Sequence, residues 1–423
     1  MVVITGRRRV GKTTLVRRAF EELDAPCLYF FANAEKTERA NVADFFAENA
    51  EKLGLEGLAP SLTLRELLEF LFKRAQKTPL ILVLDEFQNF KHMAPGFFGD
   101  LQNLWDKHRK TSKILLAAAG SVTSAMKEAT EAPDAPLCGR PSAFIRLAPF
   151  STSLLKAVYK ECCQESGTPY VPDNYLALWT LTGGVAKYVE LLIEAECLTK
   201  EAMFAYAVDP SSFFVSEGTV LLHTEFKSDY ATYFEILQQA ARGRTRRREL
   251  VAHFPDRDIS GQLLRLEEHY RLLYREMPFG SAAGARNYRL VLNDEFLRFW
   301  FRYVYGCAAM IENNNSGRVV EMMLDEFADF TGRFVLERYF RRQLLETGRF
   351  ACAGSWWDRR GQNEIDVVAL DPVDKSLLFV EVKREEKRIN LDVLRERAWE
   401  FLTHNAAYRT YAMRYEGRSL KDL

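Results

Sequence analysis

The sequence predicts an α/β protein with a parallel sheet at its N-terminus, a largely helical middle and a smaller α/β unit at its C-terminus. Three observations lead to this fold class. A glycine-rich loop stands between an apolar strand and a helix at residues 6–13. An apolar run that ends in two acids follows at residues 79–87, as in a buried parallel strand. Two strand-like segments joined by a turn lie at residues 363–384.

Length and composition limit the class of protein. A chain of 423 residues is long enough for about two to four domains. Its formal net charge of zero excludes a global field that would draw it to nucleic acid or membrane, so any such preference must be local. No apolar run approaches the roughly 18 residues that span a bilayer, and the N-terminus lacks a secretion-signal pattern. We therefore expect a cytoplasmic protein without a membrane partner.

The first motif, GRRRVGKT, fits the phosphate-binding pattern GxxxxGK[ST]. The strand-like VVIT enters it and the helix-like TTLVRRAFEEL leaves it, so backbone N–H groups can surround a phosphate at the positive end of a helix. Lys12 is expected to reach the β- and γ-phosphates of ATP, and the Thr13 hydroxyl to bind Mg²⁺. The predicted nucleotide-binding residues are Gly6, Arg7, Arg8, Arg9, Val10, Gly11, Lys12, Thr13, Thr14 and Ser121.

Two further strands carry polar residues at their ends. The run PLILVLDEF (79–87) places Asp85 where a carboxylate would bind Mg²⁺, and Glu86 where it would orient or deprotonate the attacking water. The alternative is that the two acids cap the next helix. The run KILLAAAGS (113–121) ends at Ser121, which is expected to face the γ-phosphate, although Gly-Ser is also common in turns.

These motifs resemble those of the archaeal-type ATPases, in the STAND branch of the AAA+-related P-loop NTPases. The resemblance rests on GRRRVGKT, LDEFQ, the Gly-Ser pair, PLCGR (136–140) and RLAPFS (146–151). It implies an ATPase core over residues 1–150 with Glu86 as catalytic base. It also implies that Arg140 stabilises transition-state charge, with a surface ion pair as the alternative. Relatives carry a segment before the first strand, so we expect a shortened N-terminus and a weaker grip on adenine.

The sequence patterns in the middle of the chain predict a helical lid followed by a winged helix. Amphipathic helices at residues 151–225 suit a lid, and the family motif GGxPxY reads GGVAKY at 183–188. Residues 226–310 suit three short helices and a hairpin, with Thr245 as N-cap of the second helix. The segment YRLVLNDEFLRFWFRYV (288–304) resembles a family signature. Its aromatic residues recur at helical spacing, which indicates core packing.

The winged-helix segment is rich in arginine. Residues 233–290 contain eleven arginines, no lysine and seven acidic residues. Guanidinium groups bind phosphates and carboxylates through two parallel hydrogen bonds. Contact with DNA and packing inside the protein are therefore two open interpretations of this segment.

A second group of chemically active residues lies in the predicted C-terminal domain, residues 311–423. Asp366 falls in NEIDVVALD (363–371), while Glu381 and Lys383 share one face of SLLFVEVKR (376–384). Two carboxylates can hold Mg²⁺, and the metal and a lysine can then activate water. The spacing D-x₁₄-E-x-K resembles the PD-(D/E)xK nuclease signature. That resemblance implies a further metal-binding acid, Glu337, on the preceding helix.

The sequence thus predicts an ATP- and Mg²⁺-dependent ATPase whose nucleotide state controls DNA engagement or cleavage by its C-terminal domain. The alternative is an ATP-dependent switch or DNA-binding protein whose nuclease-like domain docks a partner without cleaving. A winged-helix transcriptional regulator is a third interpretation. The predicted catalytic residues are Glu86, Arg140 and Lys383, and the predicted metal ligands are Thr13, Asp85, Glu337, Asp366 and Glu381.

Overall fold

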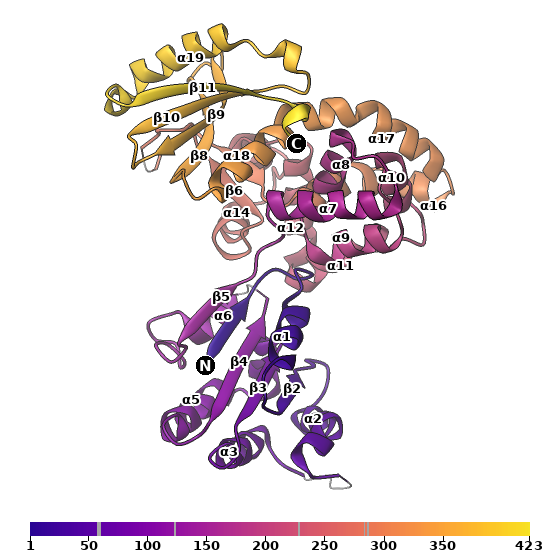
Figure 1. Ribbon diagram of the computed structural model, residues 1–423, viewed down its shortest axis with the longest axis vertical. Coiled ribbons are helices and arrows are strands. Elements are labelled where there is room, and N and C mark those ends of the chain that lie inside the picture. Colours follow the sequence, from indigo (N-terminus) through magenta and orange to yellow (C-terminus); the bar gives the residue numbers. More distant parts are fainter. Residues whose placement is uncertain (57–60, 122–123, 227–228, 283, 286) are drawn as a thin grey trace. The chain divides into compact units, whose positions relative to one another are not determined.

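The computed structural model describes residues 1–56, 61–121, 124–226, 229–282, 284–285 and 287–423. The chain divides into two compact units, Met1–Ala148 and Pro149–Leu423 (Figure 1). The predicted α/β fold class is confirmed: the first unit contains a parallel sheet, and the second contains helices, a winged-helix hairpin and a C-terminal sheet. In the described part of the chain, no helix is long and apolar enough to cross a membrane.

The first unit is built on five parallel strands in the order β2-β3-β4-β1-β5. The strands are β1 (Val2–Thr5), β2 (Cys27–Phe31), β3 (Leu80–Asp85), β4 (Ile114–Gly120) and β5 (Ala143–Arg146). The helices are α1 (Lys12–Glu21), α2 (Glu38–Leu53), α3 (Leu64–Arg74), α4 (Phe90–Met93), α5 (Phe97–His108) and α6 (Ser124–Thr130).

Both faces of this sheet are covered, which explains the continuous apolar run of β3. Leu82 and Leu84 pack into a cluster with α2, α3 and α5. Ile81 and Val83 point to the other face and join a cluster that contains Val16 of α1. A strand buried on both sides needs apolar residues at every position rather than at alternate ones. The polar residues of β3 therefore gather at its carboxyl end.

The second unit begins with helices and continues into the winged helix. The first five helices are α7 (Thr152–Ser166), α8 (Pro172–Thr182), α9 (Ala186–Glu194), α10 (Lys200–Ala207) and α11 (Phe213–Phe226). The winged helix contains α12 (Tyr230–Ala241), α13 (Arg247–Val251), α14 (Ser260–Leu264), β6 (Leu273–Glu276) and β7 (Arg289–Leu292). The helices α15 (Glu295–Phe299), α16 (Ala308–Glu312), α17 (Ser316–Phe330) and α18 (Leu336–Glu346) follow.

One detail of the winged helix differs from the sequence prediction. The N-cap of α13 is Arg246 and not Thr245. The carbonyl oxygen of Thr245 accepts a hydrogen bond of 2.6 Å from the Leu290 N–H on β7. Pairing with the hairpin thus takes Thr245 out of the capping position.

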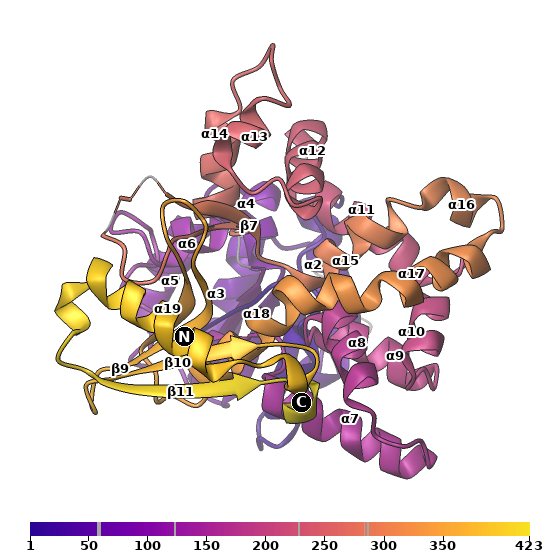
Figure 2. The same ribbon diagram turned by 90° about the horizontal axis from the view of Figure 1, so that it is seen from above.

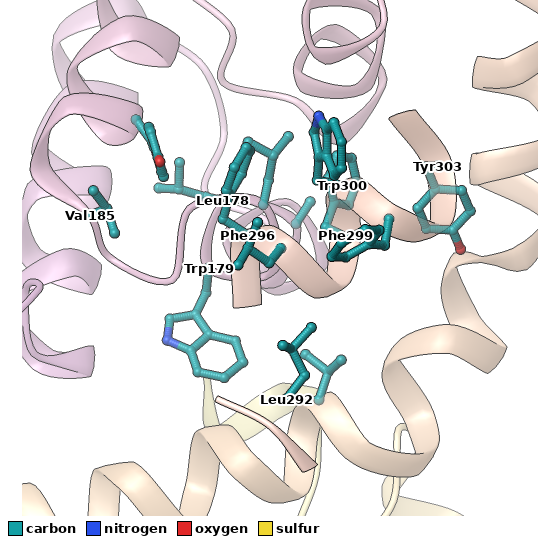
Figure 3. Packing of buried hydrophobic residues seen from close by; sticks show 14 of the residues in the cluster. Leu178, Trp179, Val185, Leu292, Phe296, Phe299, Trp300 and Tyr303 are labelled. Atoms are coloured by element: carbon teal, nitrogen blue, oxygen red, sulfur yellow. The ribbon is translucent and has the colours of Figure 1, made fainter. Parts of the chain in front are cut away.

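Aromatic residues form much of the core of the second unit, as their helical spacing predicts (Figure 3). Phe296, Phe299 and Trp300 are buried together with Trp179 of α8. The Trp300 indole N–H donates to the Val215 carbonyl oxygen at 3.2 Å. A Cβ atom at Gly218 would lie 2.2 Å from the Trp300 ring, so glycine is needed there. These rings are packed in the core and are not a surface for stacking bases.

The C-terminal sheet has four strands in the order β11-β10-β9-β8, of which β9, β10 and β11 are labelled in Figure 2. The strands are β8 (Cys352–Trp357), β9 (Glu364–Asp371), β10 (Ser376–Val382) and β11 (Ala412–Arg418), and helix α19 spans Leu391–His404. Strand β9 is antiparallel to both of its neighbours, β8 and β10, while β11 is parallel to β10. Helix α19 packs on one face of the sheet and α18 on the other.

Candidate active sites

The glycine-rich loop connects β1 to α1 in a tight conformation. Arg9 and Gly11 adopt left-handed backbone angles, with φ of 72° and 93°. A Cβ at Gly6 would lie 2.6 Å from the Leu147 carbonyl oxygen, so only glycine leaves room for the chain at the start of the loop. The Lys12 ammonium donates to the carbonyl oxygens of Gly6 at 2.9 Å and Arg7 at 3.1 Å. The loop thus places its lysine at the positive end of α1, where anions bind.

The loop and the end of β3 meet through two oxygen-bearing side chains. The Thr13 hydroxyl donates to Asp85 Oδ2 at 3.1 Å. Asp85 is buried at the last position of β3, and Thr13 is the second residue of α1. Hydroxyl and carboxylate oxygens are ligands that Mg²⁺ accepts. The geometry therefore fits the predicted metal-binding pair of this site.

Glu86 leaves the strand instead of extending it. Its φ of 50° lies in the left-handed region, which is uncommon for a residue with a side chain and is frequent at functional sites. Its N–H donates to Asp85 Oδ1 at 2.9 Å, and its carboxylate accepts a hydrogen bond from Gln88 Nε2. The two acids therefore have different partners: Asp85 accepts hydrogen bonds from Thr13, Tyr29 and the Glu86 N–H, whereas the Glu86 carboxylate accepts one from Gln88.

Tyr29 belongs to this site although no sequence motif indicated it. It lies on β2, next to β3, and its hydroxyl donates to Asp85 Oδ2. The Arg17 guanidinium lies 5.2 Å from the centre of its ring. Burial, with a further contribution from the hydrogen bond to Asp85, raises the pKa of Tyr29. The phenol therefore remains a neutral donor; its only sequence signal is a tyrosine within the apolar run CLYFF.

Ser121 and Arg140 are the two predicted residues of this unit that follow β4 in the chain. Ser121 directly follows β4, which is parallel to β3 and ends at the same edge of the sheet. Arg140 contacts Asp106 of α5, with a shortest distance of 2.7 Å, and donates to the Cys138 carbonyl oxygen at 3.1 Å. The Arg140 hydrogen bond lowers the pKa of Asp106. The structure thus contains the ion pair that was the alternative for Arg140.

The C-terminal sheet brings a second set of predicted residues together. The β9–β10 register pairs Val367 with Val380, so Asp366 and Glu381 occupy the next step of the hairpin. The Lys383 ammonium lies 3.1 Å from Asp366 Oδ2 and 3.5 Å from Glu381 Oε1. Main-chain N–H groups of Val382 and Asn390 also donate to these carboxylates, at 2.7 Å and 2.5 Å. Each acid thus shares the lysine and has a backbone donor.

Glu337 lies on α18, near this pair of acids. Burial and the negative charge of Asp366 raise its pKa well above the ordinary value for glutamate. Arg341 approaches it at 3.8 Å. Within the described ranges, no three His, Cys, Asp or Glu residues form a group that could hold a metal. The oxygens of Asp366 and Glu381 are the donor set that fits Mg²⁺, and the third ligand remains a prediction.

Several arginines of the winged helix contact other parts of the second unit. Arg289 lies 3.0 Å from Glu364 and 4.1 Å from the centre of the Trp357 ring. Four more contact side chains of the winged helix, and the pairs are Arg247–Ser260, Arg257–Thr232, Arg265–Tyr233 and Arg275–Glu267. The side chains of Arg242 and Arg246, between α12 and α13, and of Arg248, within α13, are exposed. Packing therefore accounts for part of the arginine content, and an exposed basic segment remains.

Comparison with known proteins supports the nucleotide site. Residues 1–192 match the model of a family described as an ATPase domain predominantly from Archaea. Residues 300–397 match a family described as Archaea bacterial proteins of unknown function. An uncharacterised protein of Methanocaldococcus jannaschii is 26% identical over 420 residues, which cover 93% of this chain and 86% of that protein.

The solved structures include similar folds. The Walker-type ATPase of Pyrococcus abyssi aligns with a TM-score of 0.53 at 18% identity, over 71% of this chain and 90% of that one. The ORC2 protein of Aeropyrum pernix aligns with a TM-score of 0.43 at 14% identity, over 74% and 88% of the two chains. The first alignment shows the fold. With the loop geometry, the family match shows that the chain carries an archaeal-type ATPase domain within residues 1–192.

Proposed function

We propose that this protein binds and hydrolyses ATP with Mg²⁺, and that its nucleotide state controls DNA engagement or Mg²⁺-dependent cleavage by its C-terminal domain. The ATPase part is supported by the contact of Thr13 with Asp85 and by the adjacent Lys12, which the glycine-rich loop holds at the carboxyl edge of the parallel sheet. This edge is where open α/β sheets bind their ligands.

Each residue of the first site has a distinct proposed role. Lys12 binds the β- and γ-phosphates, and Ser121 faces the γ-phosphate. Thr13 and Asp85 hold Mg²⁺, which when bound neutralises negative charge on the phosphates. Glu86 orients the attacking water and accepts its proton. These roles match the polarity and position of each side chain at the edge of the sheet.

Arg140 is proposed to stabilise charge in the transition state, in cis or in trans. To do so its guanidinium must leave Asp106, which it contacts in the structure. Two variants separate this role from the ion pair. Arg140→Ala should lower kcat by about 100-fold, whereas Asp106→Asn frees the arginine and should preserve kcat. Equal kcat values for the wild type and Arg140→Ala would assign Arg140 to the ion pair alone.

The proposed C-terminal chemistry uses the second set of residues. Asp366 and Glu381 would hold Mg²⁺, which when bound supplies a water of lowered pKa. The Lys383 ammonium, between the two carboxylates, would stabilise negative charge that develops on a phosphate. Glu337 is proposed as an additional acid at the same site. A DNA backbone would meet the exposed arginines 242, 246 and 248 through its phosphates.

One observation carries the proposed coupling: helix α18 connects the start of the second unit with the C-terminal acids. Its Arg342 donates to the carbonyl oxygens of Phe150 at 2.7 Å and Gly183 at 3.3 Å. Its Glu346 accepts a hydrogen bond of 2.8 Å from the Thr152 N–H. Glu337 lies on the same helix. A shift of the chain after the ATPase core would therefore act on the helix that bears Glu337.

ATPase and nuclease assays on matched variants test the proposal. Lys12→Ala should abolish ATP turnover, and Asp366→Ala should abolish Mg²⁺-dependent nicking while turnover continues. Arg342→Met keeps the aliphatic stem but removes the donors, so it should preserve both activities and remove the effect of ATP on nicking. Intact turnover in Lys12→Ala would contradict the ATPase site. An absence of nicking by the wild type on any DNA or RNA would contradict cleavage.

A non-cleaving switch is the second candidate function. It is favoured by the contact of Lys383 with both carboxylates, because an ammonium already compensates their charge. In this case ATP would move the lid and winged helix, and the C-terminal domain would dock a partner. Titration with Mn²⁺ distinguishes the two functions, since a nuclease site should bind the metal through Asp366 and Glu381. A salt-dependent gel shift with sequence preference would favour a DNA-binding regulator instead.

A further inference from the structure

Gln88 contacts the proposed catalytic base of the ATPase. It lies in the short turn Phe87–Asn89 after β3, and its Nε2 donates to the Glu86 carboxylate. Its Oε1 is buried and has no hydrogen-bond partner among the described residues. Turning the amide over would place this oxygen against the carboxylate, where both atoms are acceptors. The need for a donor at Glu86 therefore fixes the orientation of the amide, even though its oxygen is left without a partner.

The space around this amide is narrow. A Cβ at Gly120 would lie 2.5 Å from Gln88 Oε1 and 2.9 Å from Met126 Sδ. Gly120 is the last residue of β4 and stands immediately before Ser121. The Gln88 side chain thus lies between the end of β4 and Glu86, in a space that is open because residue 120 is glycine. Packing on one side and a hydrogen bond on the other together restrict the amide.

We propose that Gln88 is a positioning residue of the ATPase, whose amide holds the Glu86 carboxylate in the orientation that accepts a proton from the attacking water. The inference rests on the proposed role of Glu86. A glutamate side chain has several rotamers, and Glu86 is only half-buried, so packing alone does not fix its carboxylate. A neutral donor can orient this carboxylate without forming an ion pair with it.

The simpler explanation is that Gln88 only fills space beside Gly120. Gln88→Met tests this, because methionine has nearly the same length and shape but no donor. Space filling predicts wild-type kcat for this variant. Positioning predicts a kcat lower by about tenfold or more, since small misplacements of a catalytic group are costly. The KM for ATP should change by less than about twofold, because the phosphate contacts come from the loop.

Gln88→Glu is the second variant, and it covers the case in which methionine disturbs folding. It preserves the shape of the side chain but places a carboxylate against Glu86. Repulsion should displace Glu86, so kcat should fall below that of Gln88→Met. Gly120→Ala tests the same contact from β4, because its added methyl group would crowd Gln88 Oε1. It should lower kcat in the wild type and have a smaller effect in Gln88→Ala, where the crowded oxygen is gone.

Glu86→Gln separates failure of this inference from failure of the proposed function. Phosphate release at saturating ATP, binding of a fluorescent ATP analogue and thermal unfolding are measured for each variant. Wild-type turnover in Glu86→Gln would refute the role of Glu86 and the inference with it. An inactive Glu86→Gln together with wild-type kcat in Gln88→Met would overturn the positioning role alone. A kcat loss at unchanged analogue binding and melting temperature is the expected result.

Discussion

Two pairs of acids lie on the sheets of this protein, one at the carboxyl end of β3 and one across the β9–β10 hairpin, and they are held in different ways. At the end of β3, hydroxyl groups of Thr13 and Tyr29 donate to Asp85, and the Gln88 amide donates to Glu86. On the β9–β10 hairpin, Asp366 and Glu381 instead share the ammonium of Lys383. The first pair is oriented by neutral donors, and the second by a cation together with main-chain N–H groups.

This difference in hydrogen-bond donors determines how readily each pair of acids can bind a metal ion or a proton. Neutral donors fix a carboxylate without compensating its charge, so the charge remains available to a metal ion or a proton. An ammonium within about 4 Å compensates much of that charge. A metal that binds Asp366 and Glu381 must therefore compete with Lys383 for the same oxygens. We therefore expect the proposed first site to accept a metal without rearrangement, and the proposed second site to accept one only if Lys383 moves.

The largest expected effect comes from removing the ammonium group of Lys12 at the first site. Lys12→Ala should lower ATP turnover at least about 100-fold, because the ammonium contributes charge stabilisation where the phosphates react. Phosphate release measures the effect. Arg18→Ala is the matched control: it removes a charge from the same helix, but Arg18 is exposed beside Glu21 and its loss should leave turnover unchanged. Similar losses in both variants would contradict a specific role for Lys12.

The next effect tests the compensating lysine of the second site. Lys383→Met should abolish nicking and yet raise the affinity for Mn²⁺ by about tenfold, since the competing ammonium is gone. Asp366→Asn should abolish nicking and lower the affinity for Mn²⁺. Isothermal titration with Mn²⁺ measures both variants. Weaker Mn²⁺ binding in Lys383→Met would show that the lysine supports the metal site and does not compete with it.

A smaller effect is expected when one neutral donor is removed from Asp85. Tyr29→Phe deletes a hydrogen bond worth about 1 kcal/mol and should lower kcat by about threefold to tenfold. The pKa of Tyr29 is raised above the ordinary value of about 10, so its hydroxyl keeps its proton at alkaline pH. The ratio of wild-type to variant kcat should consequently stay constant between pH 7 and 9.5. A ratio that falls toward one in this range would show that Tyr29 ionises there.

The sequence predicts the parts of both sites that depend on local spacing. The loop motif, the acids at the end of β3 and the Asp366–Glu381–Lys383 spacing were all visible as patterns. Tyr29 was not, because its role arises from the pairing of β2 with β3, in which Tyr29 lies beside Val83.

Contacts between distant segments also explain the other differences. Threonine is common at N-caps, but the carbonyl oxygen of Thr245 accepts a hydrogen bond from the N–H of Leu290, 45 residues later in the chain. Strands β8 and β11 complete the C-terminal sheet without any motif of their own. Local periodicity predicts helices and strands, whereas the partner of a side chain depends on which strands become neighbours.

The smallest expected effect comes from an ion pair outside both sites, Arg140 with Asp106. The pKa of Asp106 is lowered by the Arg140 hydrogen bond, so the pair stabilises the fold above the ordinary pKa of aspartate and loses this effect as the pH falls through the lowered value. Asp106→Asn should lower the melting temperature by about 1–3 °C, equally at pH 5 and pH 8, because both lie above this range. A difference that shrinks from pH 8 to pH 5 would contradict the lowered pKa, because protonated Asp106 would already have lost the ion pair at pH 5. Asp106 is exposed, whereas Asp366 is half-buried and Glu381 is buried, so we expect Arg140 to stabilise its partner less than Lys383 stabilises the two acids beside it.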